Sequence, residues 1–190
     1  MTETITATVR NGVDTTTMFA TLDALKAQPE IAKFQFRARN RWIGGAHNRS
    51  TIKDFSAAGG EDTSRAHAFT LDAGEPAILL GTDTGPNPAE YLLHALAACV
   101  TTSLVYVAAA RGVRLTEVES TLEGDLDVQG AMGLSPEVRN GFQQIRMTIR
   151  IAGDAPPDKL RQVVQRGTDR SVIFDSINAG VPVTVEVVTD

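Results

Sequence analysis

The chain has 190 residues with a net charge of -5, and 42% of its residues are hydrophobic while 22% are charged. This composition is ordinary for a globular protein, and its acidic balance argues against nucleic acid or an anionic membrane as a partner. One cysteine, Cys99, rules out an internal disulfide and a zinc site built from several cysteines. The N-terminus lacks a basic segment followed by an apolar one, so we expect a soluble, cytoplasmic protein of one substantial domain or two lobes.

The N-terminal segment, residues 1–31, predicts a strand and a helix. Thr4–Val9 favours a short strand, and Asn11-Gly12 is a turn signal. Asp14–Lys26 carries apolar residues at helical spacing, and Pro29 ends that helix. The apolar residues are Met18, Phe19, Leu22 and Leu25.

Two alternating segments predict an antiparallel hairpin. In Ala32–Trp42, apolar side chains alternate with polar and cationic ones, as is typical of a half-buried strand. Gly44-Gly45 favours a tight turn, after which Asn48–Phe55 returns antiparallel. A solvated strand face accounts for most of the arginines on this hairpin, which are Arg37, Arg39, Arg41 and Arg49.

The chain between this hairpin and the next helix is expected to be mostly loop. Ala57–Ser64 is a glycine-rich loop, and His67–Leu71 is expected to form a strand. Gly81–Pro86 is then a loop that leads into a long apolar segment.

That segment, Asn87–Arg111, gives the strongest helix signal in the chain. Asn87 suits the N-cap, Pro88 suits the first helical position, and Glu90 at N3 can reach back to the cap. Gly112 follows as a natural C′ residue. A helix from Pro88 to Arg111 would extend about 36 Å.

The predicted helix is apolar nearly all round. Tyr91–Ala110 carries no formal charge and is long enough to cross a membrane. His94, Thr101 and Thr102 and the absence of flanking basic residues argue against that interpretation. We therefore expect a central helix enclosed by sheet or by a second copy of the chain.

The remaining elements complete an α+β pattern with mostly antiparallel sheets around a long central helix. Two strands are predicted on either side of a long loop at residues 130–142, followed by a helix that Pro156-Pro157 opens, a short helical turn and a final strand. These segments are Glu117–Val128, Gln144–Ile151, 156–167, Ser171–Ile177 and Val181–Val188.

Cys99 is the first candidate for chemistry. A single cysteine on an apolar helix is usually a small buried hydrophobe, and burial disfavours the thiolate. Cys99 also lies about three turns from the start of the helix, too far for the helix dipole to help. A reactive Cys99 therefore needs a cation from another segment, and the arginine-rich hairpin can supply one. His47, His67 and His94 are too scattered for a metal motif, so neither a metal nor a cofactor is expected.

Asn87-Pro88 followed by an apolar helix with Ala97-Ala98-Cys99 resembles the OsmC/Ohr family, the osmotically inducible and organic hydroperoxide resistance proteins. Trp42-Ile-Gly-Gly and Gly180-Val-Pro-Val-Thr-Val also fit the resemblance. It covers residues 32–190, which we take as an OsmC-like domain, with residues 1–31 as an appended extension.

The resemblance implies a thiol peroxidase in the form of an intertwined homodimer, with each site built from both chains. A helix thiolate attacks the O–O bond of an organic hydroperoxide, a second cysteine resolves the sulfenic acid, and a dithiol regenerates the pair. An arginine on the first hairpin stabilises the thiolate, and a glutamate at the start of the helix positions that arginine.

The residues match this pattern in part. Cys99 matches the attacking cysteine, and Arg49 is the best match to the arginine, with Arg41 as the alternative. The family glutamate position holds Ala89, with Glu90 one residue later, and the second cysteine position holds Ser171. Our candidate catalytic residues are therefore Cys99, Arg49 and Glu90, although Glu90 has an equally good role in a capping box.

Three hypotheses remain open at this point. The chain is a one-cysteine peroxidase that uses an external thiol reductant, an OsmC-like dimer that binds a small apolar ligand, or a structural dimer in which Cys99 only packs. The second and third hypotheses remain open because Ala89 and Ser171 differ from the glutamate and cysteine of the family pattern.

Overall fold

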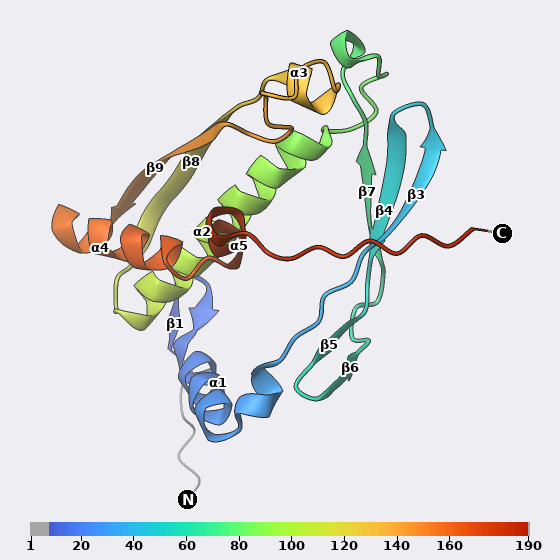
Figure 1. Cartoon of the computed structure of the whole chain (residues 1–190). Coiled ribbons are helices and arrows are strands. Elements are labelled where there is room, and N and C mark those ends of the chain that lie inside the picture. The colour runs from blue at the N-terminus through green and yellow to red at the C-terminus, as the bar shows by residue number, and fades with distance from the viewer. Residues whose placement is uncertain (1–7, 190) are drawn as a thin grey trace, which may run out of the picture. The chain divides into compact units, whose positions relative to one another are not determined.

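The computed structural model describes residues 8–189 and consists of two compact units. Among the described residues, the first unit contains Thr8 and Asp14–Leu92, and the second contains Val9–Val13 and residues 93–189 (Figure 1). Residues 4–7 of the predicted strand Thr4–Val9 lie outside the described residues. The division into residues 1–31 and 32–190 stays a prediction.

A small hairpin opens the described chain. Strand β1 (Val9–Arg10) pairs with β2 (Val13–Asp14), and Asn11 and Gly12 between them both have positive φ, at 53° and 77°. Two positive φ angles are what a tight two-residue hairpin turn needs, so the Asn-Gly turn signal is confirmed. The Asn11 amide also donates to the Val113 carbonyl at 2.9 Å, which ties the hairpin to the second unit.

The first helix, α1 (Thr15–Ala27), agrees with the prediction. The Asp14 carboxylate accepts from the Thr16 and Thr17 amides at 2.9 and 3.2 Å and so caps the N-terminus. The helix ends before Pro29, which opens a 3₁₀ turn, η1 (Pro29–Ala32). Phe19 and Leu22, two of its predicted apolar residues, are exposed in the single chain.

A three-stranded antiparallel sheet forms the centre of the first unit. Its order is β3 (Arg39–Gly44), β4 (His47–Ile52) and β7 (Phe69–Ala73), with a tight turn at Gly45 that confirms the predicted hairpin. The predicted strand Ala32–Trp42 is too long, because residues 33–38 have only one bridge, between Gln35 and Ser56. Apolar and polar side chains alternate in this segment, but a strand also requires a neighbouring strand that continues its backbone hydrogen bonds.

The predicted loop Ala57–Ser64 instead contains half of a second hairpin. Strand β5 (Phe55–Ala57) pairs with β6 (Gly60–Asp62), and Ala58 and Gly59 form the turn with φ of 49° and 80°. A second 3₁₀ turn, η2 (Ala77–Leu79), precedes the loop that leads to the long helix.

The long helix α2 (Pro88–Ala110) is capped at both ends as its sequence predicts. At its start, Asn87 and Glu90 exchange side-chain to backbone hydrogen bonds, each 2.8 Å long. At its end, Gly112 has a φ of 74°, and the Gly112 and Val113 amides donate to the Ala109 and Ala108 carbonyls. These bonds form a capping box and a Schellman motif, which satisfy end groups the helix leaves free.

The second unit contains a long antiparallel ribbon. Strand β8 (Leu115–Asp125) pairs with β9 (Gln144–Gly153), whose alternation was predicted correctly. The predicted strand Glu117–Val128 ends early, because the Asp127 carboxylate accepts from the Gln129 amide and starts a short helix, α3 (Val128–Ala131). Capping by aspartate here competes with strand extension.

Two further helices belong to the second unit. Helix α4 (Pro157–Thr168) buries Leu160 and Val163, as predicted. Its Gly167 backbone lies against Leu104 of α2, where an added Cβ would fall 2.5 Å from the Leu104 Cα. Helix α5 (Val172–Ala179) is longer than the predicted single turn at Ser171–Ile177, and Ser171 is its N-cap.

The apolar core lies in the second unit, which contains α4, β8, β9 and most of α2 (Figure 1). One face of α2 and residues of α4 pack with the inward-facing residues of β8 and β9. The buried members of this cluster are Leu96, Val100, Leu104, Val107, Ala108, Val113, Leu160 and Val163. Helix α2 is long and apolar enough to cross a membrane, with a mean hydropathy of 1.8 over its most apolar window, but core helices pass the same test.

The predicted final strand Val181–Val188 is wrong for this single chain. Among the described residues, 181–189 follow α5 in no regular structure and pair with no strand. Val183 and Val185 are each 80% exposed. The alternating pattern favours a strand, but the pattern does not provide the neighbouring strand that would complete its hydrogen bonds.

Candidate functional site

Cys99 lies in α2 between the buried residues Leu96 and Val100, in the part of the helix that belongs to the second unit. It is a free thiol and is only partly buried in the single chain. Cys99 is therefore not fully enclosed in the single chain, unlike the neighbouring core residues Leu96 and Val100.

Arg49, the predicted cation, lies in β4 opposite Asp72 of β7. Its Nε donates to Asp72 Oδ1 at 2.8 Å, and its Nη2 donates to Oδ2 at 3.2 Å. This arrangement is the two-pronged pairing in which a guanidinium is held both in position and in orientation. The hydrogen bonds of Arg49 in the described chain thus go to a carboxylate on a neighbouring strand.

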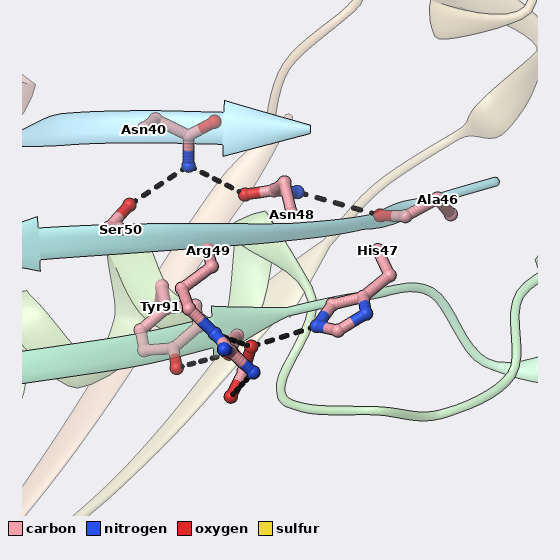
Figure 2. A network of polar contacts seen from close by, with 8 residues as sticks. Asn40, Ala46, His47, Asn48, Arg49, Ser50 and Tyr91 are labelled. Atoms are coloured by element: carbon pink, nitrogen blue, oxygen red, sulfur yellow. Dashed lines mark hydrogen bonds and ion pairs between the residues drawn. The ribbon is translucent and has the colours of Figure 1, made fainter. Parts of the chain in front are cut away.

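Asp72 is also a contact point for two other residues. His47, two residues before Arg49 on β4, places Nε2 2.8 Å from Asp72 Oδ1. The Tyr91 hydroxyl, in the first turn of α2, donates to the Asp72 carbonyl at 2.6 Å. Figure 2 shows His47 and Arg49 reaching the same acceptor, while Asn48 and Ser50 meet Asn40 in a separate network.

The charges in this cluster stabilise one another. The hydrogen bonds from Arg49, and then from His47, hold the pKa of Asp72 below its ordinary value. The same bond to Asp72 raises the pKa of Arg49. At neutral pH the pair is therefore an ionised carboxylate and a guanidinium.

Arg41, the alternative cation, lies directly opposite Arg49 on β3. The two arginines line a hollow of about 560 Å³ on the sheet of the first unit. The other residues of this hollow are Arg39, Asn40, Ile43 and Thr51. Like charges directly across two strands repel, so the carboxylate of Asp72 compensates for the juxtaposition of Arg41 and Arg49.

Glu90 contributes to the helix cap. Its carboxylate accepts from the Asn87 amide at 2.8 Å, and the Asn87 side-chain amide donates to Glu75 at 3.3 Å. The capping role predicted for Glu90 is confirmed, while a catalytic role for it stays a prediction. Ala89, where the resemblance implies a glutamate, has no polar side chain.

Ser171 is 1% exposed, and its hydroxyl accepts from the Phe174 amide at 3.2 Å. Its predicted role as the cap of the last helix is confirmed. Cys99 and Ser171 lie in the second unit and Arg49 and Glu90 in the first, so the approach of Arg49 to Cys99 stays a prediction.

Sequence reasoning missed Asp72 and His47. Asp72 is 23 positions from Arg49, and only the register of β4 against β7 brings them together. Asp72 lies one residue beyond the predicted strand His67–Leu71 but inside the observed β7, where aspartate is uncommon. Within residues 8–189, no group of three or more His, Cys, Asp or Glu side chains is arranged to hold a metal ion.

Comparison with known proteins identifies the family. A family model described as OsmC-like protein matches residues 81–186. An OsmC-like protein from Mycoplasma pneumoniae is similar, with 15% identity, coverage of 75% of this chain and 86% of that chain, and a TM-score of 0.57. An organic hydroperoxide resistance protein from Legionella pneumophila has 19% identity, coverage of 77% and 90%, and a TM-score of 0.53. Another, from Elizabethkingia anophelis, has 14% identity, coverage of 76% and 88%, and a TM-score of 0.52.

The match defines an α+β protein with an OsmC-like fold, in which small antiparallel sheets accompany one long helix. The chain belongs to the OsmC-like family, as its Asn-Pro helix cap and cysteine indicate. No curated protein matches the chain. Family membership identifies α2 as the core helix of a soluble protein rather than a membrane span.

Proposed function

We propose that the chain reduces organic hydroperoxides through Cys99 and is regenerated by an external thiol. The observation that carries this proposal is the free, only partly buried Cys99 in the long helix of an OsmC-like protein. Solved structures with this fold include proteins named for organic hydroperoxide resistance. At these low identities, the structural similarity supports the fold alone, and the chemistry is our inference.

The proposed reaction has three balanced steps. The Cys99 thiolate attacks the outer oxygen of ROOH, the O–O bond breaks, and with one proton the products are ROH and a Cys99 sulfenic acid. An external thiol R′SH displaces hydroxide from the sulfenic acid to give a mixed disulfide and water. A second R′SH then releases the Cys99 thiol and leaves R′SSR′. The external thiol is needed because Ser171 cannot form a disulfide.

Arg49 is the cation that we assign to the thiolate. A thiol in an apolar helix needs a positive neighbour to ionise, and a guanidinium stays charged at every accessible pH. Arg41 is the alternative, and the two are separable by substitution. We expect Arg49→Met to slow alkylation of Cys99 at neutral pH and to move the rate-versus-pH curve to higher pH. If alkylation is unchanged, Arg49 is excluded and Arg41→Met becomes the test.

We further propose that the functional form is an intertwined homodimer in the cytoplasm. Two exposed features support a second copy as partner: the valine-rich C-terminal segment and the aromatic side chains of the first unit, among them Phe34, Phe36 and Phe69. We assign no nucleic acid or membrane partner, since the net charge is -5. Sedimentation equilibrium that gives a folded monomer at micromolar concentration would contradict the dimer.

The direct test is stopped-flow mixing of the reduced protein with cumene hydroperoxide. We expect one equivalent to be consumed, with dimedone trapping a sulfenic acid on Cys99 by mass spectrometry. Cys99→Ser is the matched control, because it removes one sulfur and keeps a small side chain. Equal consumption by both proteins, or none by either, would rule out Cys99 as a peroxidatic thiol.

Ser171→Cys tests whether position 171 matches the family's second cysteine. If it does, one equivalent of hydroperoxide should join the two cysteines and give a protein about two mass units lighter than its reduced form. The parent protein should instead gain one or two oxygens. A variant that also gains only oxygens contradicts the correspondence, unless a general thiol oxidant still joins the two cysteines.

A second candidate function is binding of a small apolar ligand without turnover. The observation that favours it is that Glu90, the carboxylate next to the glutamate position implied by the resemblance, and Ser171, at the implied second-cysteine position, both serve as helix caps. Ligand-dependent stabilisation of the protein without peroxide consumption would support this alternative. A disulfide in Ser171→Cys formed by a general oxidant but not by hydroperoxide would support it too.

A further inference from the structure

The carboxylate partner of Arg49 lies on a strand rather than on the long helix. The helix position that would carry this glutamate is Ala89, and the carboxylate of Glu90 accepts from its own helix cap. The guanidinium of Arg49 instead donates to the carboxylate of Asp72, which lies opposite it on β7. An oriented cation therefore exists in this chain without the helix glutamate.

We propose that Asp72 is the positioning residue for Arg49, with His47 as the second donor that fixes the carboxylate. This proposal rests on the proposed function only in taking Arg49 as the cation that activates Cys99. The acidic partner has thus moved from the first turn of α2 to the neighbouring strand β7. Asp72 acts through Arg49 and does not itself contact the reacting atoms.

The geometry of the pair leaves part of the guanidinium available. Arg49 uses Nε and Nη2 for Asp72, and within the described residues Nη1 makes no hydrogen bond. A guanidinium has five N–H donors, so the outer edge keeps the donors that a thiolate or a hydroperoxide oxygen requires. By accepting from Nε and Nη2, Asp72 orients the guanidinium of Arg49 and, in the described part of the chain, leaves Nη1 free to donate to another acceptor.

His47 and Tyr91 restrict Asp72 from two sides. His47 Nε2 contacts the same Oδ1 that accepts from Arg49 Nε, and the His47 side chain is only 20% exposed. The Tyr91 hydroxyl holds the main chain of Asp72 at 2.6 Å. Tyr91 belongs to α2, eight positions before Cys99 in the same helix. The carboxylate is therefore fixed in both side chain and backbone.

The charge balance of the sheet supports this role for Asp72. Arg41 lies opposite Arg49, and neither Arg39 nor Arg41 has an ion pair in the part of the chain that the structure describes. Without a carboxylate, repulsion from these neighbours would favour a solvent-directed rotamer of Arg49. Asp72→Asn keeps the size of the side chain and removes the charge, so it tests this balance directly.

The test compares alkylation of Cys99 over pH 5–10 in four variants. Arg49→Met removes the cation, Asp72→Asn removes its partner, and Asp72→Glu keeps the charge. Glu61→Gln is the matched control, because Glu61 pairs with Arg37 in the same unit through an equivalent carboxylate–guanidinium contact. Circular dichroism and the fluorescence of Trp42 establish that each variant is folded.

We expect Asp72→Asn to slow alkylation at neutral pH about tenfold, as loss of about 1.4 kcal/mol of thiolate stabilisation would. The curve should shift to higher pH, as in Arg49→Met. Asp72→Glu should recover part of the rate, and Glu61→Gln should leave it unchanged. In the Arg49→Met background, Asp72→Asn should have no further effect, because a positioning residue acts only through the residue that it positions.

The outcomes separate this proposal from the proposed function. An unchanged curve in Asp72→Asn, with a shifted curve in Arg49→Met, overturns the role of Asp72 and leaves the peroxidase proposal standing. Shifted curves in both variants, with no consumption of cumene hydroperoxide by the parent, support Asp72 and overturn the peroxidase proposal. If Asp72→Asn fails to fold, His47→Gln takes its place, and an alkylation curve that does not move in His47→Gln overturns the proposal.

Discussion

The two units of the chain differ in how they are held together. Every hydrophobic side chain that is buried in the described residues belongs to the second unit, where α2, α4, β8 and β9 enclose them. The first unit combines helix α1 with small sheets and carries exposed aromatic side chains, and the tilted rings of Phe36 and Phe55 have centroids 5.4 Å apart. Its long-range side-chain contacts are mostly polar, such as those of Arg49 and Arg37.

This difference indicates that the first unit obtains its apolar contacts from elsewhere. A two- or three-stranded sheet gains independent stability only by burying an apolar face. Phe36 is 70% exposed and Trp42 is 72% exposed in the single chain. Cys99 belongs to the second unit, which has its own core, whereas Arg41 and Arg49 belong to the first. We expect a second copy of the chain to cover the aromatic side chains.

The largest effect is expected at the C-terminal segment. Val183 and Val185 share one face of an extended segment, and burying a valine is worth about 1.5–3 kcal/mol. We expect Val183→Asp with Val185→Asp to weaken dimerisation by about 3–6 kcal/mol. Thr184→Asp, on the opposite face, is the control. Sedimentation velocity that shows unchanged dimers in the double variant would place the interface elsewhere.

The next effect compares the two units directly. Leu104 is fully buried in the second unit, and Leu104→Ala should cost about 2–5 kcal/mol in the free energy of unfolding by urea. Phe36→Ala in the first unit removes an exposed side chain and should cost little if the chain is a monomer. A loss of about 2 kcal/mol or more at Phe36 would show that the assembled protein buries it.

How much of this arrangement the sequence predicts depends on how local each cause is. The caps of α2 and α5 were predictable, because Asn87, Glu90 and Ser171 act within three residues of themselves. The hairpin turn at Ala58-Gly59 was missed, because alanine seldom adopts a positive φ. Val181–Val188 has the pattern of a strand, but its partner strand is not among its sequence neighbours.

The site was predictable only in part for the same reason. Cys99 and Arg49 were identified by their places in the helix and the hairpin. Glu90 was predicted as the partner of Arg49, because the resemblance places a glutamate at the start of the helix and Glu90 is the nearest one in the sequence. The register between β4 and β7 instead aligns Arg49 with Asp72, and no local pattern encodes that register.

A smaller effect is expected at the start of α2. The Asn87 side chain accepts from the Glu90 amide at 2.8 Å, so Asn87→Ala should cost about 1 kcal/mol in stability. Glu90→Gln retains an acceptor for the Asn87 amide and should cost less. If Glu90 instead has a catalytic role, Glu90→Gln will reduce the rate of hydroperoxide consumption by more than Asn87→Ala does.

The smallest effects are expected from acid, and they report on each unit separately. The bonds from Arg49 and then His47 lower the pKa of Asp72 in the first unit, and the bond from Arg146 lowers the pKa of Asp125 in the second. A carboxylate with a lowered pKa stabilises the fold above its unfolded value of about 3.9, and this contribution is lost as pH falls through the folded value. Stability should therefore decline with pH below about 5.

Two spectroscopic probes distinguish the units in that acid titration. Trp42 is the one tryptophan of the chain and lies in β3, while the longest helix, α2, lies mostly in the second unit. Asp72→Asn should flatten the decline of the thermal midpoint with pH when Trp42 fluorescence is followed, and Asp125→Asn should flatten it when helical circular dichroism is followed. Both pairs are partly exposed, so salt should weaken both effects. Equal responses of both probes to both variants would mean that the two units unfold as one cooperative structure, because separate units would respond only to their own carboxylate.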